Sequence, residues 1–247
     1  MPRMKTFQLK FAWEKNLTPN IKHLAFTRTD GEALSFTPGQ FITFLFEVDG
    51  KTKRRSYSIA SIPKKAEETE IAISYMQGGI ASETLFNLQT GQSLTCSGPF
   101  GRLILRDTDK PKRFVLVATG TGVAPYRSML PEIADRLEAD PELEIVLLLG
   151  VQYRRDLLYA DDFLDFATQH QRFTFRAYFS RDTLEQPQSY EYQGYVQSAF
   201  PDLQLDPDED LIYLCGNPNM IDNAFAWLSD AEFSPHSVRR EKYISSN

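Results

Sequence analysis

The chain has 247 residues, of which 42% are hydrophobic and 24% charged, so it can bury one large core or two modest ones. Its formal net charge of −6 excludes a general affinity for nucleic acids, because no excess of basic side chains neutralises phosphates. Two cysteines, Cys96 and Cys215, exclude a disulfide framework and a four-cysteine iron–sulfur cluster. The N-terminal residues lack an apolar signal core, and no run is long enough to span a membrane. We expect a cytoplasmic monomer without a metal site.

The first part of the chain, residues 7 to 105, alternates short apolar runs with turn signals. β-branched and aromatic residues are frequent in these runs, as is typical of strands. Many short strands at fairly regular spacing predict a closed or nearly closed antiparallel barrel. The expected strands are residues 7–11, 21–28, 41–48, 55–59, 71–76 and 93–97.

One predicted strand of this part carries the run Arg55-Ser56-Tyr57-Ser58. Alternate side chains of a strand share a face, so Arg55 and Tyr57 point one way and the two serines the other. A guanidinium suits a phosphate, an aromatic ring suits a flat heterocycle, and a hydroxyl suits a ring nitrogen. The alternative is a solvated edge strand that continues the basic run 51–55, and the side chains alone favour this alternative.

Glycine-containing segments come before two predicted helices. Gly78-Gly79-Ile80-Ala81-Ser82 follows a predicted strand, and Gly120-Thr121-Gly122 follows the buried strand 115–119. The free amides of a first helical turn, with glycines that permit close backbone approach, form a site for an anion. The alternatives are a helix merely capped by Ser82 in the first case and a plain tight turn in the second.

The second part of the chain follows a polar linker at residues 107–111 and alternates strands with helices. This alternation predicts a parallel sheet with helices on both faces and a ligand at the carboxyl ends of the strands. The ordinary G-x-G-x-x-G dinucleotide fingerprint is absent. The expected strands are 114–119, 144–150, 173–179, 210–215 and 238–243, and the expected helices are 123–138, 160–169, 195–200 and 219–229.

Taken together, the motifs resemble those of the ferredoxin–NADP reductase superfamily from about residue 7 to residue 243. The resemblance implies an FAD-binding antiparallel β-barrel over residues 1–108 and an NADP-binding α/β domain over residues 109–247. The motifs that carry it are RSYSIAS at 55–61, GGIAS at 78–82, GPFG at 98–101, GTGVAPYRSML at 120–130, LLY at 157–159, SRD at 180–182 and YLCGNPNM at 213–220.

Family roles then fall on residues of this sequence. Ser58 lies near flavin N5 and Cys215 beside the nicotinamide, so both are expected to be catalytic. Arg181 and Ser180 resemble the pair that binds the 2′-phosphate, which favours NADPH over NADH. The expected cofactor-binding residues are Arg55, Ser56, Tyr57, Ser58, Gly79, Ile80, Ala81 and Ser82 for FAD, and Gly120, Thr121, Gly122, Pro125, Ser180, Arg181, Tyr195, Gln197 and Gly216 for NADP(H), with Tyr243 taking part of the flavin-covering role.

Several of these residues also have plain structural interpretations. Arg181 can be a solvated loop arginine, Cys215 a small core residue at a strand end, and Cys96 reads only as core. We expect the turn after Cys215 to expose its thiol. The sequence also departs from the family: Ala118 replaces a glycine of plant-type members, Gln152 replaces an arginine of many bacterial members, and four residues follow Tyr243 where plant-type members end on an aromatic.

The resemblance implies a flavoprotein that transfers a hydride between nicotinamide C4 and flavin N5 and exchanges electrons with a separate ferredoxin or flavodoxin. The basic residues Lys51, Lys53 and Arg54 beside the flavin strand would dock such an acidic protein. One alternative is a reductase of free flavin, ferric chelates or an oxygenase component. Another is a nucleotide-binding subunit that has lost hydride transfer.

Overall fold

The computed structural model describes residues 5–63 and 67–243. They divide into two units, each of which contains its own six-stranded sheet. The first unit comprises the described residues up to Ile104 together with Ala124–Met129, and the second comprises Leu105–Val123 and the described residues from Leu130 onwards. Among the described residues, no helix combines the length and the apolar character needed to cross a membrane.

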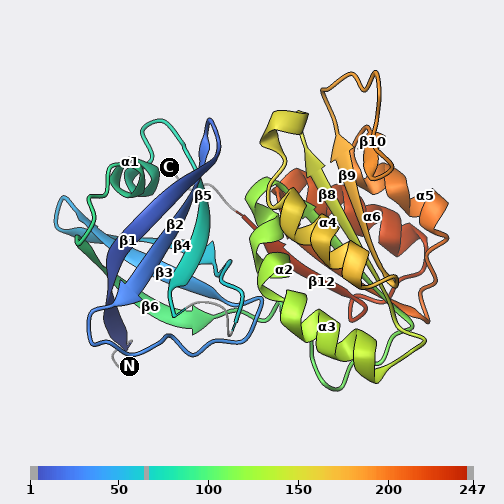
Figure 1. Ribbon diagram of the computed structural model, residues 1–247, viewed down its shortest axis with the longest axis horizontal. Helices are drawn as coiled ribbons and strands as arrows, with labels where there is room; N and C mark the ends of the chain where they lie inside the picture. Colours follow the sequence, from blue (N-terminus) through green and yellow to red (C-terminus); the bar gives the residue numbers. More distant parts are fainter. Residues whose placement is uncertain (1–4, 64–66, 244–247) are drawn as a thin grey trace. The chain divides into compact units, whose positions relative to one another are not determined.

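The sheet of the first unit is antiparallel, with the strand order β4-β3-β6-β1-β2-β5 (Figure 1). An antiparallel bridge between Ile59 and Ile71 joins the chain just after β4 to β5, so the two outer strands meet and the sheet closes. This confirms the predicted barrel. The strands are β1 (Thr6–Thr18), β2 (Ile21–Arg28), β3 (Phe41–Val48), β4 (Lys51–Ser58), β5 (Thr69–Ser74) and β6 (Ser93–Phe100).

Alternate residues of these strands fill the interior of the barrel. On β3, Ile42, Phe44 and Phe46 are buried in one cluster, as the period of two requires. The helix α1 (Ile80–Phe86) adds Leu85 to the same cluster. Burial of such side chains is worth about 2 kcal/mol each, so this cluster supplies the first unit with its own core.

The sheet of the second unit is parallel, with the order β10-β9-β8-β7-β11-β12. It confirms the predicted strand–helix alternation, and β9 has the bounds expected from the sequence. The short strand β10 was not predicted. The strands are β7 (Arg113–Thr119), β8 (Glu144–Val151), β9 (Phe173–Phe179), β10 (Glu191–Gln193), β11 (Asp210–Gly216) and β12 (Val238–Lys242).

Helices cover both faces of this parallel sheet. The helices α5 (Phe200–Leu203) and α6 (Pro218–Asp230) share a buried cluster with alternate residues of β7, β8 and β11. The helices α3 (Leu130–Ala139) and α4 (Ala160–Gln169) lie on the opposite face (Figure 1). On that face Phe163 of α4 packs against Phe175 of β9, with ring centroids 5.3 Å apart.

The single helix predicted over residues 123–138 is wrong. The structure instead has the short turn η1 (Gly120–Val123), the helix α2 (Ala124–Ser128) and then α3. Prolines at 125 and 131 favour helix starts, which explains why one helical pattern is divided. The chain also changes unit here, because α2 belongs to the first unit while η1 and α3 belong to the second.

Candidate functional site

In the second unit, the glycine turn lies directly after β7, at the carboxyl edge of the parallel sheet. Gly120 has φ of 52°, a left-handed value that favours glycine. A Cβ at Gly120 would meet nothing within 4 Å, whereas a Cβ at Gly122 would lie 2.4 Å from the carbonyl oxygen of Cys215. Gly122 is therefore needed for packing of the turn against β11, while the open space lies at Gly120 and the half-buried Thr121.

A second glycine turn, after β11, meets the first one. Gly216 has φ of 121°, and a Cβ there would lie 2.6 Å from Oγ1 of Thr119. The same Oγ1 accepts a hydrogen bond of 2.9 Å from the amide of Asn217. The strand order reverses between β7 and β11, and ligands of open α/β sheets bind at such a switch point. The two turns thus lie where a nucleotide is expected.

The Cys215 side chain lies at the end of β11 and is fully buried, so the expectation that the turn exposes it is wrong. Burial raises the pKa of its thiol well above the ordinary value, the charge of Glu241 raises it further, and a hydrogen bond from Tyr243 opposes both. The amide of Tyr243 also donates to the carbonyl of Gly216 over 2.8 Å. Tyr243 therefore lies against the second glycine turn, and residues 244–247 lie outside the described residues.

Arginines follow β8 and β9 at the same edge. Arg154, in the turn η2 (Arg154–Asp156), donates to both carboxylate oxygens of Glu191 over 2.8 and 2.5 Å. Arg155 and Arg181 are exposed, and neither forms an ion pair with any of the residues that the structure describes. The Arg155 guanidinium lies over the Tyr153 ring, 4.6 Å from its centre. Ser180, next to Arg181, donates its hydroxyl to the carbonyl of Val151.

Tyr195 and Gln197 flank the start of the turn η3 (Val196–Ala199), which packs on the end of β8. A Cβ at Gly150 of β8 would lie 3.0 Å from Cβ of Val196, so glycine permits this contact. Tyr195 is 69% exposed. Oε1 of Gln197 is buried and has no hydrogen-bond partner within the described chain, which is rare for a native acceptor.

In the first unit, the predicted flavin motif lies on β4 and just beyond it. Ser58 is buried, and Tyr57 packs edge-on to Phe44 with ring centroids 5.9 Å apart. Burial raises the pKa of the Tyr57 phenol to about 12, although the Arg55 charge opposes this shift. Arg55 is half-buried, and Ser56 forms a 2.9 Å hydrogen bond with Thr43. The motif therefore has a buried polar end at Ser58 and an exposed start.

The GGIAS segment forms the start of α1, as predicted. Gly79 is the N-cap residue, and no side chain caps the helix. The Ser82 hydroxyl instead donates to the carbonyls of Met76 and Gly79, over 2.6 and 3.0 Å. The alternative that Ser82 merely caps the helix is therefore wrong. The amide of Glu83 is the first to bond within the helix, to Gly79, which leaves the amides of Ile80 and Ala81 outside the helical ladder.

The remaining expected residue, Pro125, lies in α2 and thus in the first unit rather than with the glycine turn. In the same helix, Arg127 forms an ion pair with Glu70, a contact that the sequence did not predict because the residues lie 57 positions apart.

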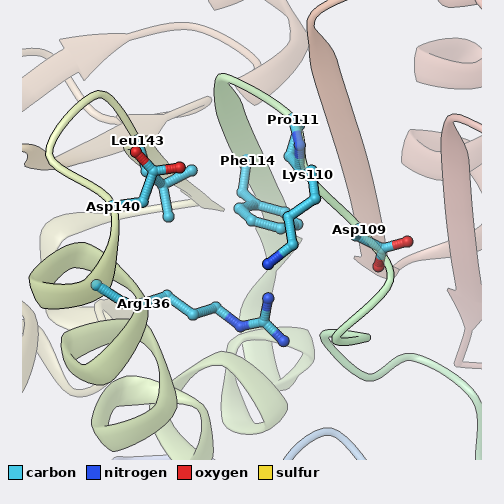
Figure 2. A pocket seen from close by; sticks show the side chains of 8 residues that line it. Asp109, Lys110, Pro111, Phe114, Arg136, Asp140 and Leu143 are labelled. Carbon is cyan, nitrogen blue, oxygen red and sulfur yellow. The ribbon is translucent and has the colours of Figure 1, made fainter.

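A hollow of about 230 Å³ lies at the opposite, amino edge of the parallel sheet (Figure 2). The charged ends of Lys110 and Arg136 point toward each other in this view, and the Arg136 guanidinium lies 5.9 Å from the centre of the Phe114 ring. Arg136 is held by Glu132 over 2.9 Å, and Asp109 by Arg239 over 2.6 Å. The charged side chains that line the hollow are thus largely neutralised within the protein, and the hollow lies away from both glycine turns.

Comparisons with known proteins match two separate family models to successive parts of the chain. An oxidoreductase FAD-binding domain matches residues 8–104, and an oxidoreductase NAD-binding domain matches residues 116–225. The chain is 32% identical to ferredoxin–NADP reductase B of Sorangium cellulosum, over 90% of each protein.

Two further similarities concern an oxygenase component and a solved structure. The chain is 32% identical to the electron transfer component of toluate 1,2-dioxygenase from Pseudomonas putida, over 86% of this chain and 60% of that protein. It superimposes with a TM-score of 0.82 on a ferredoxin NADP+ reductase from Neisseria gonorrhoeae with bound FAD and NADP, at 24% identity and over 97% and 99% of the two chains. The chain belongs to the ferredoxin–NADP reductase superfamily and is an FAD-dependent oxidoreductase that uses a nicotinamide dinucleotide.

Proposed function

We propose that this protein is an NADPH-dependent reductase that exchanges electrons with a separate ferredoxin or flavodoxin. Residues 1–108 bind FAD and residues 109–247 bind NADP(H) in this proposal. The observation that carries it is the pair of exposed arginines, Arg155 and Arg181, that lack carboxylate partners among the described residues. A forked guanidinium is suited to a phosphate, and the 2′-phosphate distinguishes NADPH from NADH.

The donor set at the carboxyl edge fits the rest of a dinucleotide. Gly120 and Thr121 offer open backbone for a pyrophosphate, next to the turn at Gly216. The orphaned Oε1 of Gln197 suits the amino group of an adenine, and the exposed Tyr195 ring suits stacking on it. The residues assigned to NADP(H) are Gly120, Thr121, Gly122, Pro125, Ser180, Arg181, Tyr195, Gln197 and Gly216.

The first unit has a donor set that fits FAD. Arg55 and the free amides at Ile80 and Ala81 suit a pyrophosphate, and Tyr57 and Ser58 suit the ring. Ser58 orients the ring by its hydroxyl, and the Cys215 thiol stays protonated because burial raises its pKa. When bound, FAD supplies the exchange between a hydride and single electrons. The residues assigned to FAD are Arg55, Ser56, Tyr57, Ser58, Gly79, Ile80, Ala81, Ser82 and Tyr243.

The basic side of β4 supports an acidic protein partner. Lys51, Lys53 and Arg54 are exposed on an outer strand, and none of them forms an ion pair with a described residue. Charges that the fold leaves unpaired on one strand can steer a partner of opposite sign. Ferredoxins and flavodoxins are the carriers that this proposal assigns to that surface.

Steady-state rates with NADPH and a panel of acceptors test the proposal. We expect the highest kcat/KM with a ferredoxin or flavodoxin, compared with free FMN, a ferric chelate and ferricyanide. A high rate with free FMN alone would contradict the protein partner. The double variant Lys53→Glu, Arg54→Glu should raise the KM for the carrier about tenfold at low salt and less at high salt. The matched control Lys110→Glu changes an exposed lysine of the second unit and should leave that KM unchanged.

Reduction of an oxygenase component is the second candidate function. It is favoured by the similarity to the toluate dioxygenase electron transfer component, of which this chain spans 60%. A panel that includes an isolated oxygenase with and without added ferredoxin separates the two. Direct reduction of the oxygenase without a carrier would favour the second candidate.

A further inference from the structure

A buried charged cluster lies inside the first unit and consists of residues with no assigned role at either cofactor. Oε2 of Glu70, on β5, lies 2.7 Å from Nη1 of Arg127 on α2 and 3.3 Å from Nε2 of His23 on β2. The side chains of His23, Glu70 and Arg127 are only 5%, 10% and 15% exposed. Burial alone would raise the pKa of Glu70, but hydrogen bonds from His23 and Arg127 bring it below its ordinary value. Glu70 is therefore ionised at neutral pH.

The cluster is anchored on its outer side by an aromatic stack. The Trp13 ring lies parallel to the His23 ring, with centroids 5.4 Å apart and an angle of 14° between the planes. Nε1 of Trp13 donates to the carboxylate of Glu68 over 2.9 Å. These contacts restrict His23 to the side of Glu70, so the cluster has one defined arrangement.

The same groups hold the backbone at the end of the flavin motif, just after Ser58. Nη1 of Arg127 donates to the carbonyl of Ala60 over 2.7 Å, and the amide of Ala60 donates to the carbonyl of Glu70 over 2.7 Å. One residue earlier, the amide of Ile59 donates to the carbonyl of Gln40 over 2.9 Å. The amide of Ile59 and both the amide and the carbonyl of Ala60 are thus hydrogen-bonded. The bond to the Ala60 carbonyl comes from the charged group of Arg127.

A buried ion pair is weak support for stability, because burial of two charges costs about as much as their attraction returns. A directional role explains the cluster better, since a guanidinium that bonds a carbonyl and a carboxylate fixes both in space. Arg127 also lies only five residues beyond Gly122, so the helix that follows the first glycine turn carries the group that bonds the Ala60 carbonyl.

We infer that Arg127 is a positioning residue for Ser58, acting through Ala60 and Glu70. The inference rests on the proposed role of Ser58 at the flavin ring. Loss of the guanidinium removes the side-chain bond to the carbonyl of Ala60 and so loosens the backbone next to Ser58, without removing any group assigned to FAD or NADP(H). The rate of flavin reduction falls while the affinity for NADPH is retained.

The test compares Arg127→Ala and Arg127→Lys with the matched control Arg136→Ala. Arg136 has a side chain 14% exposed, an ion pair with Glu132 and no assigned role at either cofactor. Hydrogen exchange of a peptide that contains Ile59 and Ala60 reports the backbone directly, in protein with and without FAD. Stopped-flow reduction by NADPH reports the reaction, and Tm reports general stability.

We expect Arg127→Ala to speed exchange at Ile59 and Ala60 and to slow flavin reduction about 10- to 100-fold, with the KM for NADPH changed less than about twofold. Arg127→Lys should restore part of the protection from exchange and part of the rate of flavin reduction, because the lysine ammonium still donates hydrogen bonds. Arg136→Ala should lower Tm but change neither the amide exchange at Ile59 and Ala60 nor the rate of flavin reduction. Unchanged exchange at Ile59 and Ala60 in Arg127→Ala, or an equal change in Arg136→Ala, would overturn the inference.

Ser58→Ala separates this inference from the proposed function. A normal rate of flavin reduction in Ser58→Ala would refute the role of Ser58, and the inference would fall with it even if exchange at Ala60 changed. A slow Ser58→Ala enzyme together with a fast Arg127→Ala enzyme would leave the proposed function intact and refute the positioning role alone. If Arg127→Ala does not fold, the same measurements on Arg127→Lys and Glu70→Gln decide, since the inference requires faster exchange at Ala60 in Glu70→Gln.

Discussion

The two edges of the parallel sheet use arginine in different ways. At the amino edge, Arg113 donates to both carboxylate oxygens of Asp210, and Arg239 does the same with Asp109. Asp210 is almost completely buried, with a side chain 3% exposed. These arginines are fully engaged in joining the starts of neighbouring strands to each other and to the segment before β7.

At the carboxyl edge, two of the three arginines that follow β8 and β9 lack such partners. Arg154 is held by Glu191, but Arg155 and Arg181 have no carboxylate partner among the described residues and lie exposed. A guanidinium without a carboxylate partner is available to a ligand, whereas a paired one is not. We therefore expect the pairing of a charged side chain, rather than its residue type or the nearest hollow, to distinguish charges that hold the fold from charges that bind a ligand.

The amino edge gives the largest expected effect. Asp210→Asn removes the charge that Arg113 faces and should lower the free energy of unfolding by about 3 kcal/mol, because a mostly buried guanidinium is left without its counter-ion. The KM for NADPH should stay unchanged. Urea denaturation and steady-state kinetics measure the two quantities. A raised KM without a loss of stability would abolish the contrast between the edges.

The reverse pattern is expected at Arg181. Arg181→Ala should raise the KM for NADPH about 30-fold, equivalent to about 2 kcal/mol for a charged hydrogen bond to phosphate. The KM for NADH and the free energy of unfolding should change little. Parallel kinetics with both dinucleotides supply the measurement, and equal effects on the two would refute the 2′-phosphate role.

Arg155 and Arg154 are neighbours and form a matched pair. Arg155→Ala should raise the KM for NADPH about fivefold, or about 1 kcal/mol, because its guanidinium is exposed and screened by solvent. Arg154→Ala should leave that KM unchanged and should instead raise the pKa of Glu191, which the hydrogen bond from Arg154 now holds below its ordinary value. If the two substitutions exchange these effects, the assignment of the free arginine is wrong.

The smallest effect is the response of the amino edge to acid. Burial would raise the pKa of Asp109, but the hydrogen bonds and charge of Arg239 hold it below its ordinary value. Because the pKa is lower in the folded state, Asp109 adds stability above its ordinary pKa of about 3.9 and loses it as the pH falls through the lowered value. Urea denaturation between pH 7 and 3 should show a steeper loss for the wild type than for Asp109→Asn.

Strongly patterned elements could be predicted from the sequence with their correct bounds. The strands 21–28, 41–48 and 173–179 and the helix 160–169 are confirmed residue for residue. Each combines an apolar period with a clear boundary, such as the turn at Asp49-Gly50. The strand expected over 93–97 is longer in the structure, because β6 continues through Phe100 and takes in most of the GPFG motif at 98–101.

The extent of β1 could not be predicted. It runs from Thr6 to Thr18 rather than over 7–11, and its register against β2 shifts between Phe11 and Trp13. A register shift breaks the period of two on which the prediction depends. Beyond it, the polar residues 14–16 pair with β2 through main-chain bonds that carry no side-chain signal.

The prediction of the candidate site from the sequence was limited in a similar way. The motifs predicted which segments come together at the glycine turns, because strand ends of a parallel sheet share an edge. They could not show that Arg154 has a carboxylate partner while Arg155 has none among the described residues, since Glu191 lies 37 residues from Arg154, on the unexpected strand β10. The compartment, the monomeric state and the identity of the carrier stay predictions.

The path of the chain through α2 has a consequence for engineering and for evolution. The six residues Ala124–Met129 are contributed to the first unit by a later stretch of sequence, and both Met129 and Tyr126 are buried there. A chimera with a single junction near residue 108 would take its whole second half from another protein. The helix of that protein at the position of α2 would then have to fill the space that Ala124–Met129 fill in the first unit. Exchange of halves between relatives therefore demands that this helix travel with the barrel it completes, so a working chimera needs three junctions rather than one.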